Sequence, residues 1–377
     1  MMNTTTTTTT TRKWNNNNTL MMMKMDPKIW SKLPPEILEY ILSFLPLKTL
    51  LNLRSTCKGF WSLVFSPSFT SKYSSSSSPF SSFLLLSHPQ FHRHYPLYDC
   101  TLGTWRNISL SLSDSSPSSF TNVVSSGGLF CLSDSMSCSL LIFNLLAKTS
   151  RKIQYPSYSL HLEHLTFVTT PSGYIIFSLF SASATNRAFV YDSEVRSWRR
   201  FNGFGPILGD KLHQQGVFFN RGLYFATPEP FSIVRFDLES GVWERPVGEL
   251  PGQLTFARLV SDGEGKLYLI GGVGNNGISR SIKLWELGEA GDWVEVQSLP
   301  ELMCRKFVSV CYHKYEHVYC FWHEGMICIC CYTWPEILYY LVSRRTWHWL
   351  PRCPSLPLKC SCGFKWFSFV PKLYASV

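Results

Sequence analysis

Three groups of residues have types and spacings that could support chemistry, and the first is glycine-rich. Gly272-Val-Gly274-Asn-Asn-Gly277 fits the G-x-G-x-x-G pattern of dinucleotide-binding loops. That pattern requires a helix next, because the helix N-terminus holds the pyrophosphate. Here Ile278–Leu287 instead alternates apolar and polar residues, as a strand does. The sequence therefore favours a glycine-rich hairpin loop over a nucleotide site.

The other two groups are potential zinc ligands in short segments: His88, His92 and His94, and Cys328, Cys330 and Cys331. Zinc sites usually combine paired C-x-x-C spacings or matched histidines, and neither group has such a spacing. Cys360 and Cys362 would need ligands from elsewhere. The G-x-S-x-G and H-E-x-x-H patterns of hydrolases and metalloproteases are also missing. We therefore expect no catalytic residue, no metal and no cofactor.

The composition is that of a globular protein. Of 377 residues, 45 % are hydrophobic and 15 % aromatic, which argues against global disorder. Aliphatic or aromatic runs, such as Phe83–Leu86, are far shorter than the ~20 residues of a membrane span. Residues 1–25 hold threonine, asparagine and methionine runs without a secretory h-region. We expect a disordered low-complexity tail there; the alternative is a transit peptide, because the stretch is basic and has no acid.

The cysteines and the net charge indicate the cellular compartment and the kind of partner. Nine of the thirteen cysteines follow residue 300, and without a secretory signal we expect them to be buried thiols in a reducing compartment. The expected location is the nucleus, the cytoplasm or both. The net charge of +10 suits an acidic protein partner better than nucleic acid, because the basic doublets are scattered at the edges of strand-like segments. These doublets are Arg151-Lys152, Arg199-Arg200, Arg305-Lys306 and Arg344-Arg345.

A short helical block precedes a long region of strand-like segments. After Pro34 and Pro35, the apolar residues Ile37, Leu38, Ile41, Leu42 and Leu45 recur at helical spacing until Pro46. Two further short helical segments follow, around Leu50 and Phe60. Helices of this length bury only part of such a surface on one another, so a partner must cover the rest. The alternative is a helical cap packed on the neighbouring β domain.

The order of residues in this block resembles the F-box. The resemblance runs without a gap over about residues 30–70, through Leu33-Pro34-Pro35-Glu36-Ile37-Leu38, Ile41-Leu42-Ser43-Phe44-Leu45-Pro46, Leu53-Arg54-Ser55-Thr56-Cys57-Lys58 and Ser66-Pro67-Ser68-Phe69. Phe60 stands where many members have Trp, and Tyr73 where plant members often have His.

The resemblance implies docking to the Skp adaptor of cullin–RING ubiquitin ligases, by burial of helices in an apolar groove. It assigns the interface, part of which should be intramolecular core, to Leu33, Pro34, Ile37, Leu38, Ile41, Leu42, Leu45, Pro46, Leu50 and Leu53, with Cys57 and Phe60 behind them.

A repeated pattern organises the long β region. An apolar strand runs into an acidic or polar residue, and Trp follows six or seven residues later: Asp99 with Trp105, Asp192 with Trp198, Asp237 with Trp243, and more loosely Glu286 with Trp293 and Leu341 with Trp347. Asn144 begins a copy that lacks its Trp. The anchors 99, 144, 192, 237, 286 and 341 are 45, 48, 45, 49 and 55 residues apart, which is the period of propeller blades. We expect the polar anchors to hold turns and each Trp to pack between blades.

Six anchors predict six blades closed into a ring. The first anchor has room before it for only one or two strands, whereas Phe364–Phe369 is a spare strand after the last. We expect this C-terminal strand to complete blade one and remove the open edges. Leu269-Ile270-Gly271-Gly272, with the later Trp293, resembles a kelch repeat, and the chain resembles plant F-box/kelch-repeat proteins. The predicted organisation is a tail (1–25), an F-box (26–73), a Ser-rich linker (74–81) and a kelch-like propeller (82–377).

The resemblance implies a non-catalytic substrate receptor that presents a target protein to a ubiquitin-charged conjugating enzyme. Candidate target-binding loops are Phe201–Gly209, Thr227–Phe231 and Gly271–Gly277. Two alternatives remain: a scaffold acting outside ubiquitination, for example in transcriptional regulation, and an enzyme that uses the axial pocket of the propeller.

Overall fold

The computed structural model describes residues 32–377 apart from 46, 55, 67, 70–71, 74–81, 92–93, 110–119, 135, 157–160, 183–184, 205–213, 246–247, 264 and 357–361. The chain separates into two compact units, Met1–Ser78 and Pro79–Val377. Among the described helices, none is long and apolar enough to cross a membrane.

The first unit is helical. Its described helices are α2 (Pro35–Ser43), α3 (Leu47–Arg54) and α4 (Lys58–Val64). Helix α2 begins directly after Pro34, whose extended backbone directs the chain into the helix, and proline is tolerated at the first helical position. Helix α4 begins after Cys57, whose Sγ accepts a hydrogen bond from the backbone N–H of Phe60.

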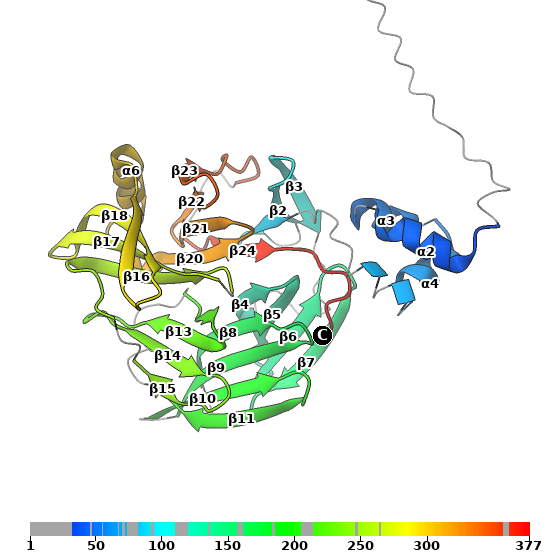
Figure 1. Cartoon of the computed structure of the whole chain (residues 1–377), viewed down its shortest axis with the longest axis horizontal. Helices are drawn as coiled ribbons and strands as arrows, with labels where there is room; N and C mark the ends of the chain where they lie inside the picture. Colours follow the sequence, from blue (N-terminus) through cyan, green and yellow to red (C-terminus); the bar gives the residue numbers. More distant parts are fainter. Residues whose placement is uncertain are drawn as a thin grey trace, which may run out of the picture. The chain divides into compact units, whose positions relative to one another are not determined.

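The second unit is a six-bladed β-propeller, as the repeat predicted. Within the described residues its strands form six four-stranded antiparallel sheets (Figure 1). Blade one, from the innermost strand outward, contains β24 (Lys365–Phe369), β1 (Phe83–Ser87), β2 (His94–Asp99) and β3 (Thr104–Ser109). Blade two contains β4 (Phe120–Ser126), β5 (Leu129–Asp134), β6 (Ser139–Asn144) and β7 (Thr149–Gln154). Blade three contains β8 (His161–Thr169), β9 (Tyr174–Ala182), β10 (Thr185–Asp192) and β11 (Ser197–Asn202).

The remaining blades repeat this order. Blade four contains β12 (Val217–Phe219), β13 (Gly222–Ala226), β14 (Ile233–Asp237) and β15 (Trp243–Glu244). Blade five contains β16 (Leu254–Ser261), β17 (Leu267–Asn275), β18 (Ile278–Leu287) and β19 (Trp293–Ser298). Blade six contains β20 (Val318–His323), β21 (Met326–Cys331), β22 (Trp334–Leu341) and β23 (Thr346–Trp349).

The C-terminal strand closes the ring, as predicted. Strand β24 pairs antiparallel with β1, with Phe83 opposite Phe369 and Ser87 opposite Lys365. Its other neighbours are β4 of blade two and β20 of blade six, and all three lie toward the middle of the unit in Figure 1. The innermost strand of the first blade is therefore the last strand in the sequence, and its pairing covers the inner edge that β1 would otherwise leave open.

Four of the polar anchors, Asp99, Asn144, Asp192 and Asp237, hold the turn between the third and fourth strands of a blade, whereas Glu286 pairs with Lys266. Oδ1 of Asp237 accepts hydrogen bonds from the backbone N–H of Glu239 at 3.1 Å and of Ser240 at 2.8 Å. Asp99 and Asp192 accept equivalent bonds in blades one and three. A short side-chain acceptor suits this position because the tight turn leaves these N–H groups without backbone partners.

The tryptophans of the repeat pack between blades. Trp105 lies between blades one and six, Trp198 between two and three, Trp243 between three and four, Trp293 between four and five, and Trp347 between five and six. The Nε1–H of Trp198 donates to the carbonyl of Gln154 at 3.0 Å, and that of Trp243 to the carbonyl of Asn202 at 2.9 Å. Both carbonyls belong to the outermost strand of the preceding blade, so each indole fixes the spacing of two sheets.

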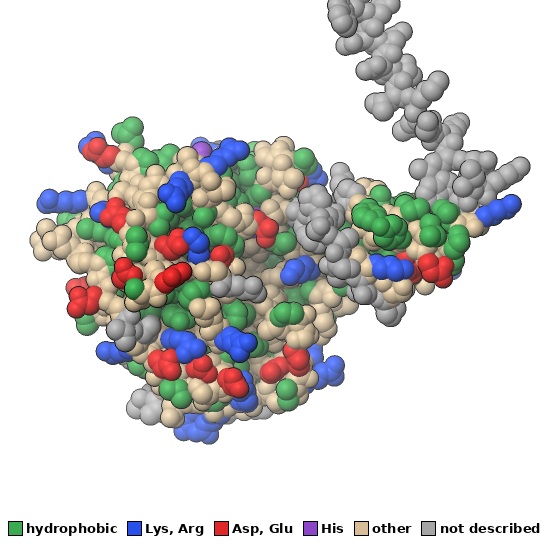
Figure 2. Space-filling view, viewed as in Figure 1, with side chains coloured by type: hydrophobic (Ala, Val, Ile, Leu, Met, Phe, Trp, Pro, Cys, Tyr) green, Lys and Arg blue, Asp and Glu red, His purple; other side chains and the backbone are tan. Residues whose placement is uncertain are grey.

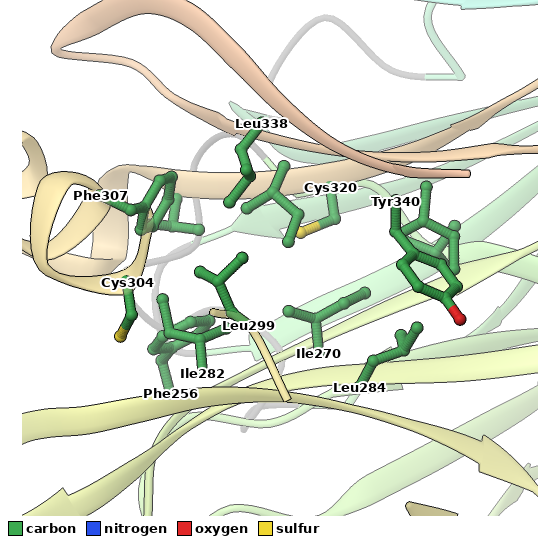
Figure 3. Packing of buried hydrophobic residues seen from close by; sticks show 14 of the residues in the cluster. Phe256, Ile270, Ile282, Leu284, Leu299, Cys304, Phe307, Cys320, Leu338 and Tyr340 are labelled. Carbon is green, nitrogen blue, oxygen red and sulfur yellow. The ribbon is translucent and has the colours of Figure 1, made fainter. Parts of the chain in front are cut away.

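One α-helix of the second unit was not predicted from the sequence. Helix α6 (Glu301–Cys311) connects blades five and six, so the doublet Arg305-Lys306 lies on a helix and not at a strand edge. Cys304, Phe307 and Cys311 face the core with residues of β16, β18, β20 and β22 (Figure 3). The ammonium of Lys306 lies 2.6 Å from a carboxylate oxygen of Glu336 and 4.0 Å from the ring centroid of Trp349. The spacing of the core residues is helical, and the β repeat on both sides obscured it.

The glycine-rich segment of blade five is a strand with a tight hairpin, not the loop Gly271–Gly277 that was expected. Strand β17 extends through Asn275, and only Asn276 and Gly277, with φ of 51° and 71°, form the turn. Gly271 and Gly272 lie inside the strand and not after it. A Cβ on Gly272 would collide with Ser279 and Thr255, whose hydroxyls meet at 2.5 Å.

Asn144, whose copy of the repeat lacks the Trp, holds the C-terminal tail. Its Nδ2 donates to the carbonyls of Lys372, Leu373 and Ala375 at 2.9, 3.2 and 3.1 Å. Its Oδ1 holds the turn as the aspartates do elsewhere, accepting from the backbone N–H of Leu146 at 3.0 Å. The chain therefore continues past β24 and attaches to blade two.

Asn144→Asp is expected to release this tail while leaving the turn intact, because aspartate keeps the acceptor and loses the amide donor. Repulsion between the new carboxylate and the tail carbonyls, with loss of the donated bonds, should lower the free energy of unfolding by about 3 kcal/mol. Urea unfolding and carboxypeptidase digestion of the full chain measure the two effects. The matched control is Asp192→Asn, the reverse exchange at the equivalent turn of blade three. If the tail resisted carboxypeptidase equally well in both variants, Asn144 would not be the residue that holds it.

His323 joins blades six and one at the closure of the ring. The side chain is fully buried, with Nδ1 at 2.8 Å from Oγ of Ser368 on β24 and Nε2 at 3.4 Å from Sγ of Cys100. Burial lowers the pKa of His323 to about 4 and raises the pKa of Cys100 to about 12. The pair is therefore a neutral thiol beside a neutral imidazole, and not the thiolate–imidazolium pair of a cysteine nucleophile.

We expect the propeller to lose stability in acid through His323. The unfolded chain takes up a proton below the ordinary histidine pKa of about 6.5, whereas the folded chain stays neutral down to about 4. The free energy of unfolding should therefore fall by up to about 3 kcal/mol over this interval. Urea unfolding across this pH range compares wild type with His323→Gln, whose amide does not titrate. Identical pH slopes for the two proteins would refute the assignment.

Candidate functional site

Helix α2 exposes an apolar stripe. The helix begins at Pro35, and Ile37, Tyr40, Ile41 and Phe44 follow at positions i, i+3, i+4 and i+7, which share one side of a helix. Their exposed fractions are 47, 59, 37 and 59 %. An amphipathic helix usually turns such a stripe toward the core of its own protein. Here the stripe faces solvent.

Helix α4 adds a second exposed apolar pair. Trp61 and Phe65 are spaced i and i+4, are 44 and 37 % exposed, and have ring centroids 4.6 Å apart. On α2, the rings of Tyr40 and Phe44 meet edge to face at 4.9 Å. Figure 2 shows hydrophobic side chains gathered over the helical unit. We call Ile37, Tyr40, Ile41, Phe44, Trp61 and Phe65 the exposed apolar set.

A small core and one carboxylate hold these helices in place. The buried apolar side chains of the described part of this unit are Leu42, Leu50, Val64, Phe69 and Tyr73. The carboxylate of Glu39 on α2 accepts from Lys72 Nζ and Ser68 Oγ, each at 2.7 Å, and from Ser66 Oγ at 3.4 Å. The bond from Lys72, followed by that from Ser68, holds the pKa of Glu39 below its ordinary value. The carboxylate therefore ties α2 to the segment after α4.

The exposed apolar set is suited to binding another protein. Its six side chains carry no carboxylate, imidazole, amine or thiol that could act as a nucleophile or as a general acid or base. Burial of one large apolar side chain contributes about 1.5–3 kcal/mol, so covering several members of the exposed apolar set can drive a stable association. Soluble proteins rarely leave such residues grouped in the open, and where they do the surface usually binds another protein.

The comparisons with known proteins decide the family. Residues 30–72 match the F-box domain. The chain is 53 % identical over 364 residues to an F-box/kelch-repeat protein of Arabidopsis thaliana, covering 94 % of this chain and 90 % of that protein. The chain belongs to the F-box/kelch-repeat proteins. More distant similarity, at 24 % identity, extends to F-box only protein 6 of Arabidopsis thaliana (87 % of this chain, 71 % of that protein) and to the Arabidopsis protein UNUSUAL FLORAL ORGANS (88 % and 80 %).

The structure of this F-box/kelch-repeat protein divides the predicted adaptor-binding residues into three groups. Exposed side chains are Pro34, Ile37, Ile41 and Cys57; half-buried ones are Leu33, Leu38, Leu45, Leu53 and Phe60; buried ones are Leu42 and Leu50. Pro46 lies outside the described residues. Leu42 and Leu50 belong to the core of the unit, which agrees with the expectation that part of the set is intramolecular core. Cys57 does not stand behind the interface as was expected, because it is the exposed cap of α4.

Four exposed aromatic residues of the F-box were missed: Tyr40, Phe44, Trp61 and Phe65. The signal was present in the sequence, because Tyr40 and Phe44 continue the helical spacing of Ile37 and Ile41. The prediction selected the interface from the residues that carry the family resemblance; of the four aromatic residues only Phe44 lies in those motifs, and it was not selected.

The candidate metal ligands of the kelch-like propeller are dispersed. Among the described residues, no three His, Cys, Asp or Glu side chains are grouped so as to hold a metal ion. The ring of His88 stacks on Phe364 at 4.5 Å. Cys328 and Cys330 are buried in β21, and burial raises their pKa values well above the ordinary value. Two of the candidates, His92 and Cys360, lie outside the described residues.

Proposed function

We propose that this F-box/kelch-repeat protein is the substrate-recognition subunit of an SCF-type E3 ubiquitin ligase. The observation that carries the proposal is the apolar stripe of α2, which faces solvent within a segment that matches the F-box. In this role the F-box docks to a Skp adaptor and, through it, to a cullin and a RING protein. The propeller holds a target protein near the ubiquitin thioester, which raises the effective concentration of target lysines.

The topology places the candidate target-binding segments on one face of the propeller. Strands alternate in direction within each blade and every blade has the same order. The turns between second and third strands therefore lie on the same face as the connections between blades. This loop face includes Thr227–Phe231, the turn Asn276–Gly277 and the start of the connection after β11, whose residues 205–209 lie outside the described residues. It also includes α6, where Leu302 is 79 % exposed. We propose that the target docks on the loop face.

Reconstitution tests this function. The full chain is mixed with purified Skp adaptor, cullin and RING protein, and complex formation is followed by size-exclusion chromatography. Proteins that bind to the propeller of the full chain are then tested as acceptors of ubiquitin, in reactions with and without the chain. A stoichiometric complex with chain-dependent transfer supports the receptor role. A folded chain that does not enter the complex would overturn it.

A further inference from the structure

The inner strands of the propeller surround a cavity of about 810 Å³ that is partly open to solvent. Its walls come from the innermost strands of all six blades: β24, β4, β8, the start of β12, β16 and β20. Pockets that hold small molecules have volumes of about 300–1,000 Å³. The adaptor-docking role of the F-box makes no use of this space.

One wall of the cavity carries the ammonium group of a lysine. Lys365, the first residue of β24, lines the cavity with its Nζ 5.7 Å from the ring centroid of Phe367. Among the described residues, no carboxylate lies within ion-pair distance of this ammonium. His164 is close enough for the charge of Lys365 to help lower its pKa to about 4, after the larger effect of burial. The charge of Lys365 therefore faces an aromatic ring and a neutral imidazole.

This environment disfavours the charged amine. Burial lowers the pKa of Lys365 to about 8, because an ammonium removed from water needs an anion to replace its hydration. The two acids that line the cavity do not supply one. Asp262 accepts from the backbone N–H of Gly265 and Lys266, in the turn after β16. Glu324 lies in the turn after β20, also at the end of the inner strands opposite to Lys365.

The rest of the wall combines neutral hydrogen-bonding groups with apolar surface. Ser126 and Thr169 meet at 3.1 Å between their hydroxyl oxygens, and Gln215 and Ser261 line other parts of the cavity. Phe167 and Trp322 supply aromatic surface. A half-buried cation, several neutral polar groups and aromatic rings suit a ligand with an anionic group on a compact organic body.

We propose that the axial cavity binds a small organic anion whose carboxylate or phosphate pairs with Lys365. Walls on all six sides favour a small molecule over a folded protein segment. Such a ligand would touch every blade at once, so its binding would stabilise the closed ring. The site is independent of adaptor docking, and its test does not depend on the ligase function.

The first experiment labels the full chain with pyridoxal 5′-phosphate, which joins an amine-reactive aldehyde to a phosphate. Borohydride traps the imine formed with loss of water, and mass spectrometry locates the modified lysines near pH 7.5. We expect Lys365 to be labelled well ahead of Lys152, an exposed lysine of β7 that serves as internal control. At this pH, an amine with a pKa of about 8 has a roughly hundredfold larger neutral fraction than an ordinary lysine. Citrate or inorganic phosphate should slow labelling at Lys365 more than sodium chloride of equal ionic strength does.

The second experiment measures thermal unfolding of the wild type and of Lys365→Met and Lys152→Met in the same salts. We expect a saturable rise of Tm with citrate or phosphate in the wild type and Lys152→Met, and none in Lys365→Met. Two results would overturn the proposal. One is labelling that increases with the solvent exposure of each lysine and leaves Lys365 unmodified. The other is a rise of Tm with citrate or phosphate that persists in Lys365→Met. Protection of Lys365 by a glutamate-rich hexapeptide, with none from citrate or phosphate, would replace the small molecule by an acidic segment of a target.

Discussion

Removal of residues 364–377 is expected to abolish the cooperatively folded propeller. The truncation deletes β24, the innermost strand of blade one, and with it Phe364, Trp366, Phe367 and Phe369, all of which are buried. It also opens β1 along the five-residue register that now pairs with β24. The chain would keep its first blade as a three-stranded sheet with an unpaired inner edge.

The magnitudes decide this outcome. Loss of one buried aromatic side chain costs about 3–5 kcal/mol, so four of them cost roughly 12–20 kcal/mol, which equals or exceeds the total stability of about 5–15 kcal/mol that typical domains possess. The unpaired edge of β1 presents backbone groups and the apolar residues Leu84–Leu86, which favours aggregation.

Circular dichroism, thermal unfolding and size-exclusion chromatography of the truncated chain check this prediction. A shorter truncation, after Val370, is the matched control, because it keeps β24 and removes only the tail held by Asn144. We expect the control to unfold cooperatively at a lowered Tm. A chain ending at residue 363 that unfolds cooperatively at the wild-type Tm would show that the ring does not depend on its closing strand.

The second large effect is expected at the F-box. Ile37→Asp/Ile41→Asp should weaken binding of a Skp adaptor by roughly a hundredfold or more, since two buried isoleucines contribute about 1.5–3 kcal/mol each and a factor of ten corresponds to about 1.4 kcal/mol. Both side chains point to solvent in the free chain, so the substitutions should leave the fold intact. The dissociation constant is measured by calorimetry, and the Tm of each variant reports on folding.

Two comparison variants separate docking from stability. Met136→Asp alters an 85 % exposed apolar residue of the propeller and should leave adaptor binding unchanged. Leu50→Ala removes a fully buried side chain of the helical unit and should act by lowering stability, by about 2–5 kcal/mol. If the folded Ile37→Asp/Ile41→Asp variant bound the adaptor as tightly as the wild type, the stripe of α2 would not be the docking surface.

Much of the fold was predictable because it repeats. The spacing of Asp99, Asp192 and Asp237 reflects one local requirement, an acceptor for the turn, so each copy reports the same structure independently. Closure by β24 followed from counting strands against anchors. Helix α6 and the extended glycine strand were not predictable in this way, because each occurs once and departs from the repeat around it.

The candidate site was predictable in outline and not in detail. Helical spacing and family resemblance located the apolar block, but they could not separate Leu42, which is buried, from Ile41, which is exposed. The two residues are adjacent and equally apolar, and only the packing of α2 against the rest of the unit decides which side meets solvent. The cavity beside Lys365 could not be predicted from the sequence, because its walls come from six segments that are distant in the sequence.

The closing strand also sets the order of events during synthesis. The ribosome releases β1 roughly 280 residues before β24, an interval of about 15–60 s at 5–20 residues per second. Throughout this time blade one lacks its inner strand, while the F-box has already emerged and blades two to six follow it in turn. A nascent chain therefore exposes its F-box before it can complete its propeller. Chaperones that cover an exposed strand edge would act on β1 during this interval, and a premature stop codon upstream of β24 would leave the chain permanently at that stage.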